Sequence, residues 1–440
     1  MLRSRPGVLV SFAIGLACAG CACAAEGPER TLTIVHTNDL HARLLPDANG
    51  RGGFAEVATT IREACAGAAA CLVMDGGDLV QGSPVSSLFE GVPVFEIANR
   101  LGLDVSTLGN HEFDYGWQKI SQFLDAADFP ILNANMMHPG GGRLGDAASI
   151  VLTTANGIRV GIVGALTESL PFLVAPEQLG EWTAQPVVES VAGIVAKLND
   201  EADVVVVLGH LTREEELALL EVPGVDFVIS GHTHSGLSEP VRDDDSAILR
   251  VRAYGHQVGR LDLTVNIETD EVTAWSWEAI PVKDVLEPDP AALEVVQAWE
   301  KKVSKFVDID LATVGHDYNR DEMRALFEQA LVEETGADFG YINPGAVRDV
   351  FLEGPLLVRH VWNAMPFEDY IATGTIKGSE LPAFLREERG LESGREYRFA
   401  TIDFVVAQWH QRGFGTLDVE HGELYRDLLI RWIGERERLD

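Results

Sequence analysis

The chain has 440 residues, of which 46% are hydrophobic and 23% are charged, and its formal net charge is −34 at pH 7. This length predicts two or three domains with substantial hydrophobic cores. So acidic a protein repels polyanions, which makes DNA, RNA and anionic membranes poor partners. A small phosphorylated ligand can still bind where metal ions or arginines reverse the field locally.

Residues 1–25 have the pattern of a secretory signal peptide. Two arginines precede an apolar stretch (residues 8–19) that is too short to span a bilayer, and small residues follow. Cleavage after Ala22-Cys23-Ala24 would release a soluble protein, whereas Ala19-Gly20-Cys21 resembles a lipoprotein box and would place a lipid anchor on Cys21. No later run is long enough for a transmembrane helix. We therefore expect an exported protein, periplasmic or extracellular, that is either free or a membrane-anchored lipoprotein.

Three of the five cysteines lie in this leader, and the other two are Cys65 and Cys71. Five small residues separate this pair. In an oxidising compartment such a pair predicts a disulfide that closes a short loop. The alternative is two buried free thiols.

Five short apolar runs between residues 30 and 235 each lead into Asp, Asn or His, and glycine lies close by in four of them. The runs and the polar residues that follow them are Thr31–Val35 with Asp39 and His41, Cys71–Met74 with Asp78, Asp104–Leu108 with Asn110 and His111, Val204–Leu208 with His210, and Val225–Ser230 with His232 and His234. Short β-branched runs bounded by glycine predict buried parallel strands, and ligands collect beyond the carboxyl ends of such strands. We therefore expect these side chains to meet and to bind metal.

Helical segments alternate with the apolar runs, which is typical of an α/β fold. The expected helices are Phe54–Glu63, Val94–Leu101 and Trp117–Ala126. Later runs alternate more strictly and predict antiparallel strands that close the domain, at Ile248–Ala253, Arg260–Val265 and Val272–Glu278. We expect a catalytic domain at residues 28–285, a linker helix at 286–306 and a smaller α/β domain at 307–440.

Together, the polar motifs resemble those of the calcineurin-like metallophosphoesterases. Two longer strings, Ile34–His41 and Gly109–Gly116, resemble the secreted 5′-nucleotidases within that class. Five motifs in the same order make a chance match improbable. The resemblance implies an N-terminal α/β sandwich, with two sheets flanked by helices, followed by a shortened C-terminal substrate-binding domain.

The resemblance also implies a centre with two divalent metal ions. Asp78 would bridge the ions; Asp39, His41 and His234 would complete one shell, and Asn110, His210 and His232 the other. This donor set contains no thiolate and suits Zn, Mn, Fe or Co better than Mg or Ca. In the family, a His–Asp dyad, here His111 and Asp114, stabilises the phosphoryl transition state while a metal-bridging hydroxide attacks phosphorus in line.

Three other polar residues lie near these motifs. We expect Glu112 to be structural and His36 to be a hydrogen-bonded core histidine within its strand. His256 is placed near the end of the sheet and could reach the site, so its role stays open.

The second domain carries two shorter likenesses to the family. Asn343–Arg348 resembles a substrate-binding loop, with Pro344 in place of a glycine, so Asn343, Gly345 and Arg348 are expected to bind substrate. Phe367 and Phe404 match two aromatic residues that sandwich the base, since stacking accepts any base by its π face. The alternative is that both are ordinary core residues.

The second domain also departs from the family pattern. The segment between Phe367 and Phe404 is short, and the Gly-Gly-Asp-Gly-Tyr string expected after it is absent; Trp409–Phe414 occupies that region. An earlier arginine of the family pocket has no clear match, although Arg320 lies close. Catalysis is therefore better supported than selectivity for base or ribose.

These features predict an exported dimetal phosphohydrolase, with 5′-nucleotidase activity on nucleoside monophosphates as the leading hypothesis. UDP-sugar pyrophosphatase and 2′,3′-cyclic-nucleotide phosphodiesterase activities are alternatives within the class. The related thiosulfohydrolases share the fold, but His111 and Asp114 favour phosphate chemistry. A secreted nucleotide- or metal-binding protein without turnover is the alternative from another class, and the complete ligand set with its dyad argues against it.

Overall fold

The computed structural model describes residues 27–440 except 48, 244–245, 284–286 and 413–416. The expected signal peptide, including Cys21, lies outside the described residues, as does the expected boundary at residue 285. Among the described residues no helix is long and apolar enough to cross a membrane.

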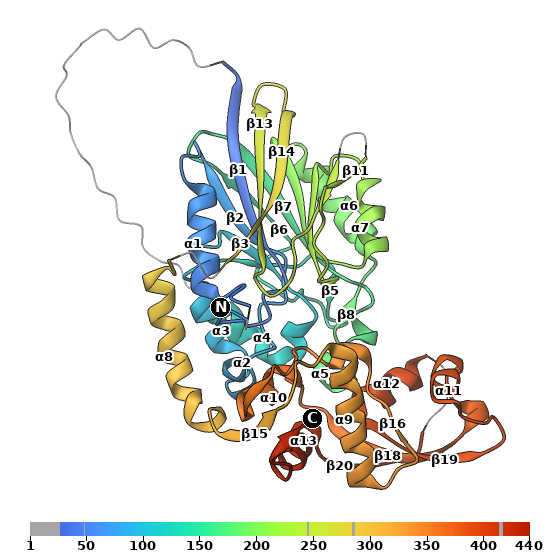
Figure 1. The fold of residues 1–440 in the computed structure, drawn as a ribbon. Helices are drawn as coiled ribbons and strands as arrows, with labels where there is room; N and C mark the ends of the chain where they lie inside the picture. Colours follow the sequence, from blue (N-terminus) through green and yellow to red (C-terminus); the bar gives the residue numbers. More distant parts are fainter. Residues whose placement is uncertain (1–26, 48, 244–245, 284–286, 413–416) are drawn as a thin grey trace.

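The N-terminal part of the chain is a sandwich of two six-stranded sheets with helices on both outer faces (Figure 1). The first sheet has the order β14-β13-β1-β2-β3-β4 and the second β11-β12-β10-β9-β7-β6. The strands of the first sheet are β1 (Glu29–Thr37), β2 (Cys71–Asp75), β3 (Val105–Thr107), β4 (Ile131–Leu132), β13 (Gln257–Asn266) and β14 (Glu271–Pro281). Those of the second are β6 (Ser149–Thr153), β7 (Arg159–Leu166), β9 (Val204–His210), β10 (Phe227–Gly231), β11 (Val241–Arg242) and β12 (Ala247–Leu249). The expected two-sheet α/β sandwich is confirmed.

Both faces of the central strands are covered, which explains their continuous apolar sequences. In β9 every residue is buried. Val204, Val206 and Leu208 face the core between the two sheets, whereas Val205 and Val207 face the outer helices. The period of two therefore directs alternate side chains into two separate cores.

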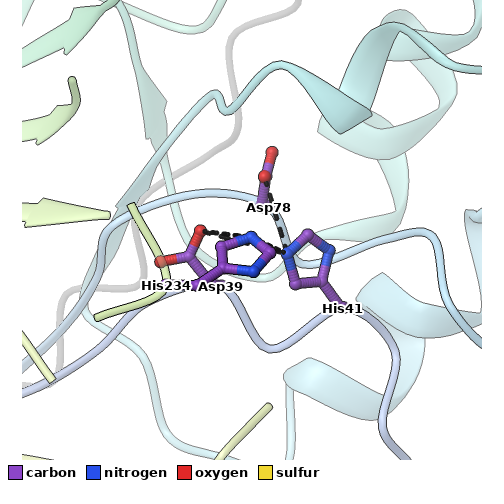
Figure 2. Close-up of side chains that lie close together, drawn as sticks. All are labelled: Asp39, His41, Asp78 and His234. Atoms are coloured by element: carbon purple, nitrogen blue, oxygen red, sulfur yellow. Dashed lines mark hydrogen bonds and ion pairs between the residues drawn. The ribbon is translucent and has the colours of Figure 1, made fainter. Parts of the chain in front are cut away.

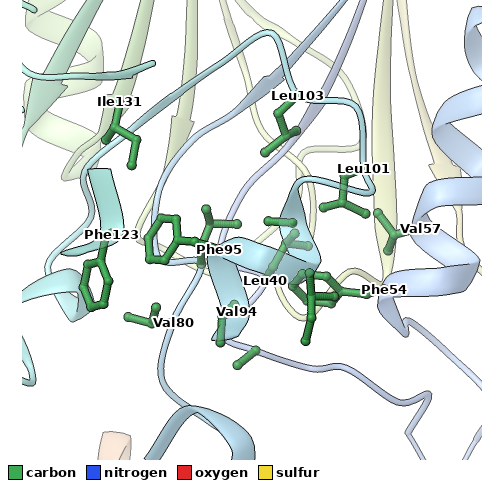
Figure 3. Close-up of a cluster of buried hydrophobic side chains, with 14 of the residues drawn as sticks. Leu40, Phe54, Val57, Val80, Val94, Phe95, Leu101, Leu103, Phe123 and Ile131 are labelled. Atoms are coloured by element: carbon green, nitrogen blue, oxygen red, sulfur yellow. The ribbon is translucent and has the colours of Figure 1, made fainter. Parts of the chain in front are cut away.

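Helices form the outer layers of the sandwich. The larger helices are α1 (Phe54–Cys65), α2 (Pro84–Leu88), α3 (Val92–Ala98), α4 (Ile120–Ala126), α6 (Val187–Leu198) and α7 (Arg213–Leu220), and a short α5 spans Pro176–Leu179. Figure 3 shows the cluster beneath α1, α3 and α4, in which the Phe95 and Phe123 rings stack with centroids 4.6 Å apart. This packing fixes the helices that flank the edge of the sandwich where the predicted metal ligands lie.

The prediction of an antiparallel strand at Ile248–Ala253 was wrong in part. β12 is short and runs parallel to β10, although it also pairs antiparallel with β11. The chain then leaves the second sheet. Tyr254, which has a left-handed backbone, donates its N–H to Asp39 O at 2.7 Å, and the next strand, β13, belongs to the first sheet. The other two expected strands are confirmed as the antiparallel hairpin of β13 and β14, which closes the first sheet against β1.

A long helix, α8 (Pro290–Val307), connects the sandwich to the C-terminal part. Asp289 caps it by accepting hydrogen bonds from the backbone N–H groups of Ala291 and Ala292, both at 3.0 Å. Figure 1 shows α8 running along the helical layer of the sandwich; it contacts α1, α2 and α3 as well as α10. The linker helix is therefore packed along its length rather than suspended between the two parts.

Within its described residues, the C-terminal part contains two small sheets and five α-helices around a core of its own. The sheets have the orders β17-β15-β21 and β16-β19-β18-β20. Their strands are β15 (Asp310–Val314), β17 (Gly354–Leu357), β21 (Arg438–Leu439), β16 (Phe339–Gly340), β18 (Tyr370–Lys377), β19 (Glu396–Ile402) and β20 (Val419–Leu424). The helices are α9 (Arg320–Thr335), α10 (Val358–Ala364), α11 (Ala383–Arg389), α12 (Asp403–Gln411) and α13 (Tyr425–Gly434).

Cys65 and Cys71 form the expected disulfide. The bond joins the last residue of α1 to the first residue of β2, at the end of the first sheet remote from the polar strand ends. It therefore restricts the turn between these two elements.

Replacing both cysteines by serine should lower the free energy of unfolding by about 2 kcal/mol, the chain-entropy value for so short a loop. Urea unfolding of the oxidised wild type and the double variant measures the difference. The kcat for the phosphate release expected from the sequence should not change, since the bond touches no residue predicted for the site. Equal unfolding midpoints would show that the loop is ordered without the bond.

Candidate active site

The ends of β1, β2 and β10 bring carboxylates and imidazoles together at one edge of the sandwich. Asp39, His41, Asp78 and His234 each offer a ligand atom, and these atoms all lie within 4.8 Å of one another (Figure 2). The Nε2 atoms of His41 and His234 are 2.8 Å apart, and Asp39 Oδ1 is 3.6 Å from His234 Nε2. Three of the four residues are buried. Such a buried convergence of oxygen and nitrogen donors fits a divalent cation.

A second group of donors surrounds the same Asp78 carboxylate. Nε2 of His210, the last residue of β9, is 3.0 Å from Asp78 Oδ2, and His41 Nε2 is 3.8 Å from that oxygen. Nδ1 of His232 is 3.0 Å from Asn110 Oδ1, and the His232 and His210 ring centroids are 5.1 Å apart. All the residues predicted as metal ligands are thus gathered around one carboxylate, and two sheets supply them.

Most of these residues have a left-handed backbone, which is uncommon for residues other than glycine. The φ angles are +53° at Asp39, +47° at His41, +56° at Asp78, +79° at His232 and +58° at His234. Each costs about 1 kcal/mol or more, and such strain gathers at functional sites. The strand-end turns therefore hold these side chains in positions that a relaxed chain would avoid.

Glycines beside the ligands permit this close packing. A Cβ atom at Gly109 would collide with Asp78 Oδ1, and one at Gly231 would lie 2.8 Å from both Gly76 O and His210 Nδ1. Neither position has room for a side chain. This explains why glycine accompanies the polar residues in the sequence.

Hydrogen bonds orient the ligand side chains from outside the cluster. Asn38 Nδ2 donates to Asp39 Oδ2 at 2.6 Å, and the backbone N–H of His111 donates to Asp78 Oδ1 at 2.9 Å. His210 Nδ1 donates to the carbonyl of Gly76 at 2.8 Å, which leaves its Nε2 directed at Asp78. The donor atoms are thus aimed inward by the surrounding chain.

Glu112 braces two of the ligand loops, in agreement with its expected structural role. Its buried carboxylate accepts hydrogen bonds from the backbone N–H groups of Gly109 at 2.6 Å, Leu79 at 2.9 Å and Asp78 at 3.1 Å. The loop after β2 is thereby tied to the loop after β3.

The pKa values of the cluster follow from burial and mutual charge. Burial alone would raise the pKa of the Asp78 carboxyl, but nearby imidazoles, His210 foremost, hold it well below its usual range. Burial lowers the pKa of His232 to about 3 and that of His234 to about 4. For His210 the Asp78 carboxylate outweighs burial and raises the pKa to about 10. His232 and His234 are therefore neutral at pH 7, the form in which imidazole binds metal.

His111 and Asp114 form the expected pair beside the cluster. His111 Nδ1 is 2.8 Å from Asp114 Oδ2, and the His111 and His41 ring centroids are 5.2 Å apart. Burial would lower the pKa of His111, but the carboxylates of Asp114 and Asp78 outweigh it and raise the pKa above its ordinary value. The other ring nitrogen, Nε2, is 3.0 Å from Arg348 Nη2.

The C-terminal part therefore contributes directly to the site through Arg348. Its guanidinium carbon lies 5.2 Å from the Phe367 ring centre, and the Phe367 and His111 centroids are 6.0 Å apart. Phe404 is half-buried and packs against the C-terminal core. Gly345 is exposed, and Asn343 begins the short turn that leads to Arg348. Of the five predicted substrate residues, Arg348 and Phe367 contact the dyad, and the roles of the other three stay predictions.

Sequence reasoning missed Tyr254 and Asn38, which contact metal-ligand candidates. Tyr254 Oη is 3.4 Å from His234 Nδ1, whereas His256, whose role was left open, is paired with Asp47 at 3.4 Å. The sequence analysis singled out His256 in this turn, but Tyr254 is the residue of the turn that contacts a metal-ligand candidate. Asn38 lies within the Ile34–His41 string, but its role depends on two hydrogen bonds with the backbone of Val251, which is distant in sequence. His36 is a buried core histidine that accepts a hydrogen bond from Trp277 Nε1 at 2.9 Å.

Comparisons with known proteins agree with this geometry. Residues 32–236 match the family model described as calcineurin-like phosphoesterase, and residues 307–416 match the one described as 5′-nucleotidase, C-terminal domain. The 5′-nucleotidase of Vibrio cholerae serotype O1 is 25% identical over 469 residues, covering 91% of this chain and 84% of that protein. The chain belongs to the 5′-nucleotidase family. It is a metal-dependent phosphoester hydrolase.

Solved structures of similar proteins share the fold of this 5′-nucleotidase family member. The 5′-nucleotidase precursor from Thermus thermophilus has a TM-score of 0.83 at 23% identity, covering 93% of this chain and 97% of that one. The sulfate thiohydrolase SoxB of the same organism has a TM-score of 0.78 at 16% identity, covering 94% and 95%. The fold is thus common to proteins named for different chemistries, and the side chains must distinguish them.

In this 5′-nucleotidase family member, Glu112→Gln should lower both the free energy of unfolding and the metal content. An amide keeps the shape of the side chain but turns one acceptor into a donor facing backbone N–H groups. Leaving a buried donor unpaired costs about 1–3 kcal/mol. Urea unfolding and elemental analysis of the purified variant measure both effects. Wild-type values in both would mean that the loops hold their positions without the carboxylate.

Proposed function

We propose that this protein is an exported 5′-nucleotidase that hydrolyses nucleoside monophosphates to nucleoside and phosphate. The observation that carries the proposal is the contact of Arg348 with His111 beside the ligand cluster. At this contact a cation suited to phosphate lies beside the His111–Asp114 pair, which in turn lies beside the predicted metal ligands. The V. cholerae relative named 5′-nucleotidase supports the choice of substrate class.

The donor set supports two ions rather than one. Asp39, His41 and His234 would hold one ion and Asn110, His210 and His232 the other, with Asp78 available to both. Imidazoles, carboxylates and one amide oxygen, without thiolate, favour Zn, Mn, Fe or Co. When bound, such ions supply Lewis-acid charge for the phosphoryl oxygens and make water a stronger nucleophile at neutral pH.

The chain's own residues then orient and stabilise the phosphoryl group. With Nδ1–H donated to Asp114, His111 presents Nε2 toward the same space as Arg348 Nη2. A phosphoryl oxygen placed there accepts hydrogen bonds from both, and the charge that develops on it in the transition state strengthens both bonds. Asp114 fixes the ring and favours the protonated imidazole, since its carboxylate raises the pKa of His111. Gln178 Nε2, which donates to Asp114 O at 2.5 Å, holds the dyad loop in place.

Phe367 and Phe404 are proposed to hold the base, with Asn343 and Gly345 forming the adjoining wall. Phe367 already lies beside Arg348, so a base stacked on its ring would be next to the phosphate position. Export is supported by the leader pattern and by the Cys65–Cys71 disulfide, since disulfides persist in oxidising compartments. A lipid anchor on Cys21 is the alternative to a released protein, and mass spectrometry of the mature protein distinguishes the two.

A phosphate-release panel tests the proposed activity. AMP, UMP, ATP, UDP-glucose, 2′,3′-cAMP and p-nitrophenyl phosphate are compared by kcat/KM with added Mn²⁺ or Zn²⁺. The proposal requires nucleoside monophosphates to have the highest value and chelation to abolish activity. Preference for UDP-glucose or 2′,3′-cAMP would replace it with the corresponding alternative, and no turnover of any ester would favour a binding protein.

His111→Ala should separate chemistry from metal binding. The variant should retain the metal content of the wild type but lose a factor of about 10²–10⁴ in kcat, the range for a positioned acid or proton-bearing group. Elemental analysis and steady-state kinetics with p-nitrophenyl phosphate give the two quantities. Loss of metal in this variant would make His111 a ligand and contradict the division of roles.

Phe367→Ala and Phe404→Ala should each raise KM for AMP, because each variant loses about 1–3 kcal/mol of stacking on the base. Neither change should alter kcat/KM for p-nitrophenyl phosphate by as much, because that ester lacks a base. Phe306→Ala, on the exposed end of α8, is the matched control. If a variant affects both substrates equally, the phenylalanine concerned supports the core and does not read the base.

A further inference from the structure

Arg348 is a cation without a nearby counter-charge. Among the described residues no carboxylate lies within ion-pair distance of its guanidinium, and its Nε is buried without a hydrogen-bond partner. The side chain lies against the Phe367 ring and 3.0 Å from His111 Nε2. A guanidinium has only donors, so it cannot bond to the divalent cations expected nearby and is repelled by them. Its position at the site therefore also depends on how the loop that carries it is attached.

The neighbouring residue supplies that attachment. Asp349 Oδ2 accepts a hydrogen bond from Arg43 Nη1 at 2.7 Å. Within the described part of the chain, this is the one ion pair that joins residues 27–283 directly to residues 307–440. The two side chains are 14% and 31% exposed, so water screens the pair only in part.

Arg43 is itself held firmly in the loop that carries metal-ligand candidates. It follows His41 by two residues, and its backbone N–H donates to Leu40 O at 3.0 Å. Its guanidinium lies 5.4 Å from the ring centre of Tyr254, whose hydroxyl reaches His234 Nδ1. The ion pair therefore anchors the Arg348 loop to the ligand loop itself.

On the C-terminal side, the loop is fixed to its own core, since Ala346 and Val347, just before Arg348, are buried there. The backbone N–H of Arg348 donates to Ala364 O at 2.9 Å, and Arg320 Nη2 contacts Arg348 O at 3.4 Å. Both partners belong to the C-terminal part, so these contacts do not fix the loop relative to His111. A further hydrogen bond between the two parts, from Ser87 Oγ to Pro366 O at 3.3 Å, is long and therefore weak.

We propose that Arg43 and Asp349 are positioning residues whose ion pair holds Arg348 at His111, and so sets the affinity of the site for the phosphoryl group. This inference rests on the proposed role of Arg348 in phosphate binding. Neither residue touches the phosphate in this scheme; both act through Arg348. A small misplacement of such a group is enough to lower the rate substantially.

A double-mutant cycle between Arg43 and Arg348 tests the proposal. Arg43→Gln and Asp349→Asn should each lower kcat/KM for p-nitrophenyl phosphate about tenfold, mainly through KM. Arg43→Lys should recover part of the loss. In the Arg348→Gln background, Arg43→Gln should have no further effect, because the residue through which it acts is gone. An equal loss in both backgrounds would overturn the proposal and make Arg43 an independent contact.

Controls separate this result from general effects. Arg324→Gln breaks an ion pair with Glu388 (3.0 Å) of similar exposure inside the C-terminal part and should leave kcat/KM unchanged. Metal content should match the wild type in Asp349→Asn; a loss there, or an effect no larger than that of Arg324→Gln, would also overturn the proposal.

Binding of inorganic phosphate, measured by calorimetry, provides a readout that needs no turnover. It should weaken about tenfold in Arg43→Gln and in Asp349→Asn but not in Arg324→Gln. If AMP is not a substrate, the 5′-nucleotidase proposal fails while p-nitrophenyl phosphate and inorganic phosphate still report on the ion pair. Unchanged phosphate affinity in both variants would reject the positioning role alone.

Discussion

The Asp78 carboxylate interacts with side chains from both sheets of the sandwich. It follows β2 of the first sheet and lies 3.0 Å from His210 of the second. A buried carboxylate is costly unless positive charge or hydrogen bonds compensate it. Here the compensation comes from imidazoles on both sheets and from the N–H of His111. The metal site therefore depends on how the two sheets are aligned and on which loops lie at their shared edge.

Much of this arrangement could be predicted from sequence, because strand ends are local features. An apolar run followed by a polar residue predicts a ligand at a sheet edge. Asp39, Asp78 and His210 all follow that pattern, and glycine precedes the last two. The sequence did not reveal how β12 would pair, since a three-residue strand is decided by its neighbours. Neither Asn38 nor Tyr254 was predicted. Asn38 contacts Val251, 213 residues further along the chain, and the contact of Tyr254 with His234 depends on a turn.

The C-terminal part was harder to predict for a related reason. A matching string identifies a loop, but which side chain reaches the site depends on how two separately folded cores meet. Phe367 and Phe404 both pack on the core of the C-terminal part, but it is Phe367, together with Arg348, that also lies against the dyad. The ion pair of Arg43 with Asp349 has no sequence signal at all, because each residue is an ordinary surface charge until the parts come together.

The left-handed backbone at five metal-ligand candidates has a consequence for the cell. At about 1 kcal/mol or more each, their combined strain approaches the net stability of about 5–15 kcal/mol that a domain possesses. Cations that bind only the folded chain offset this strain by mass action. The steady-state abundance of the protein should then follow the metal supply of its compartment, since an unloaded chain opens more often and is cleared by proteases. Metal scarcity would reduce the number of enzyme molecules as well as the activity of each.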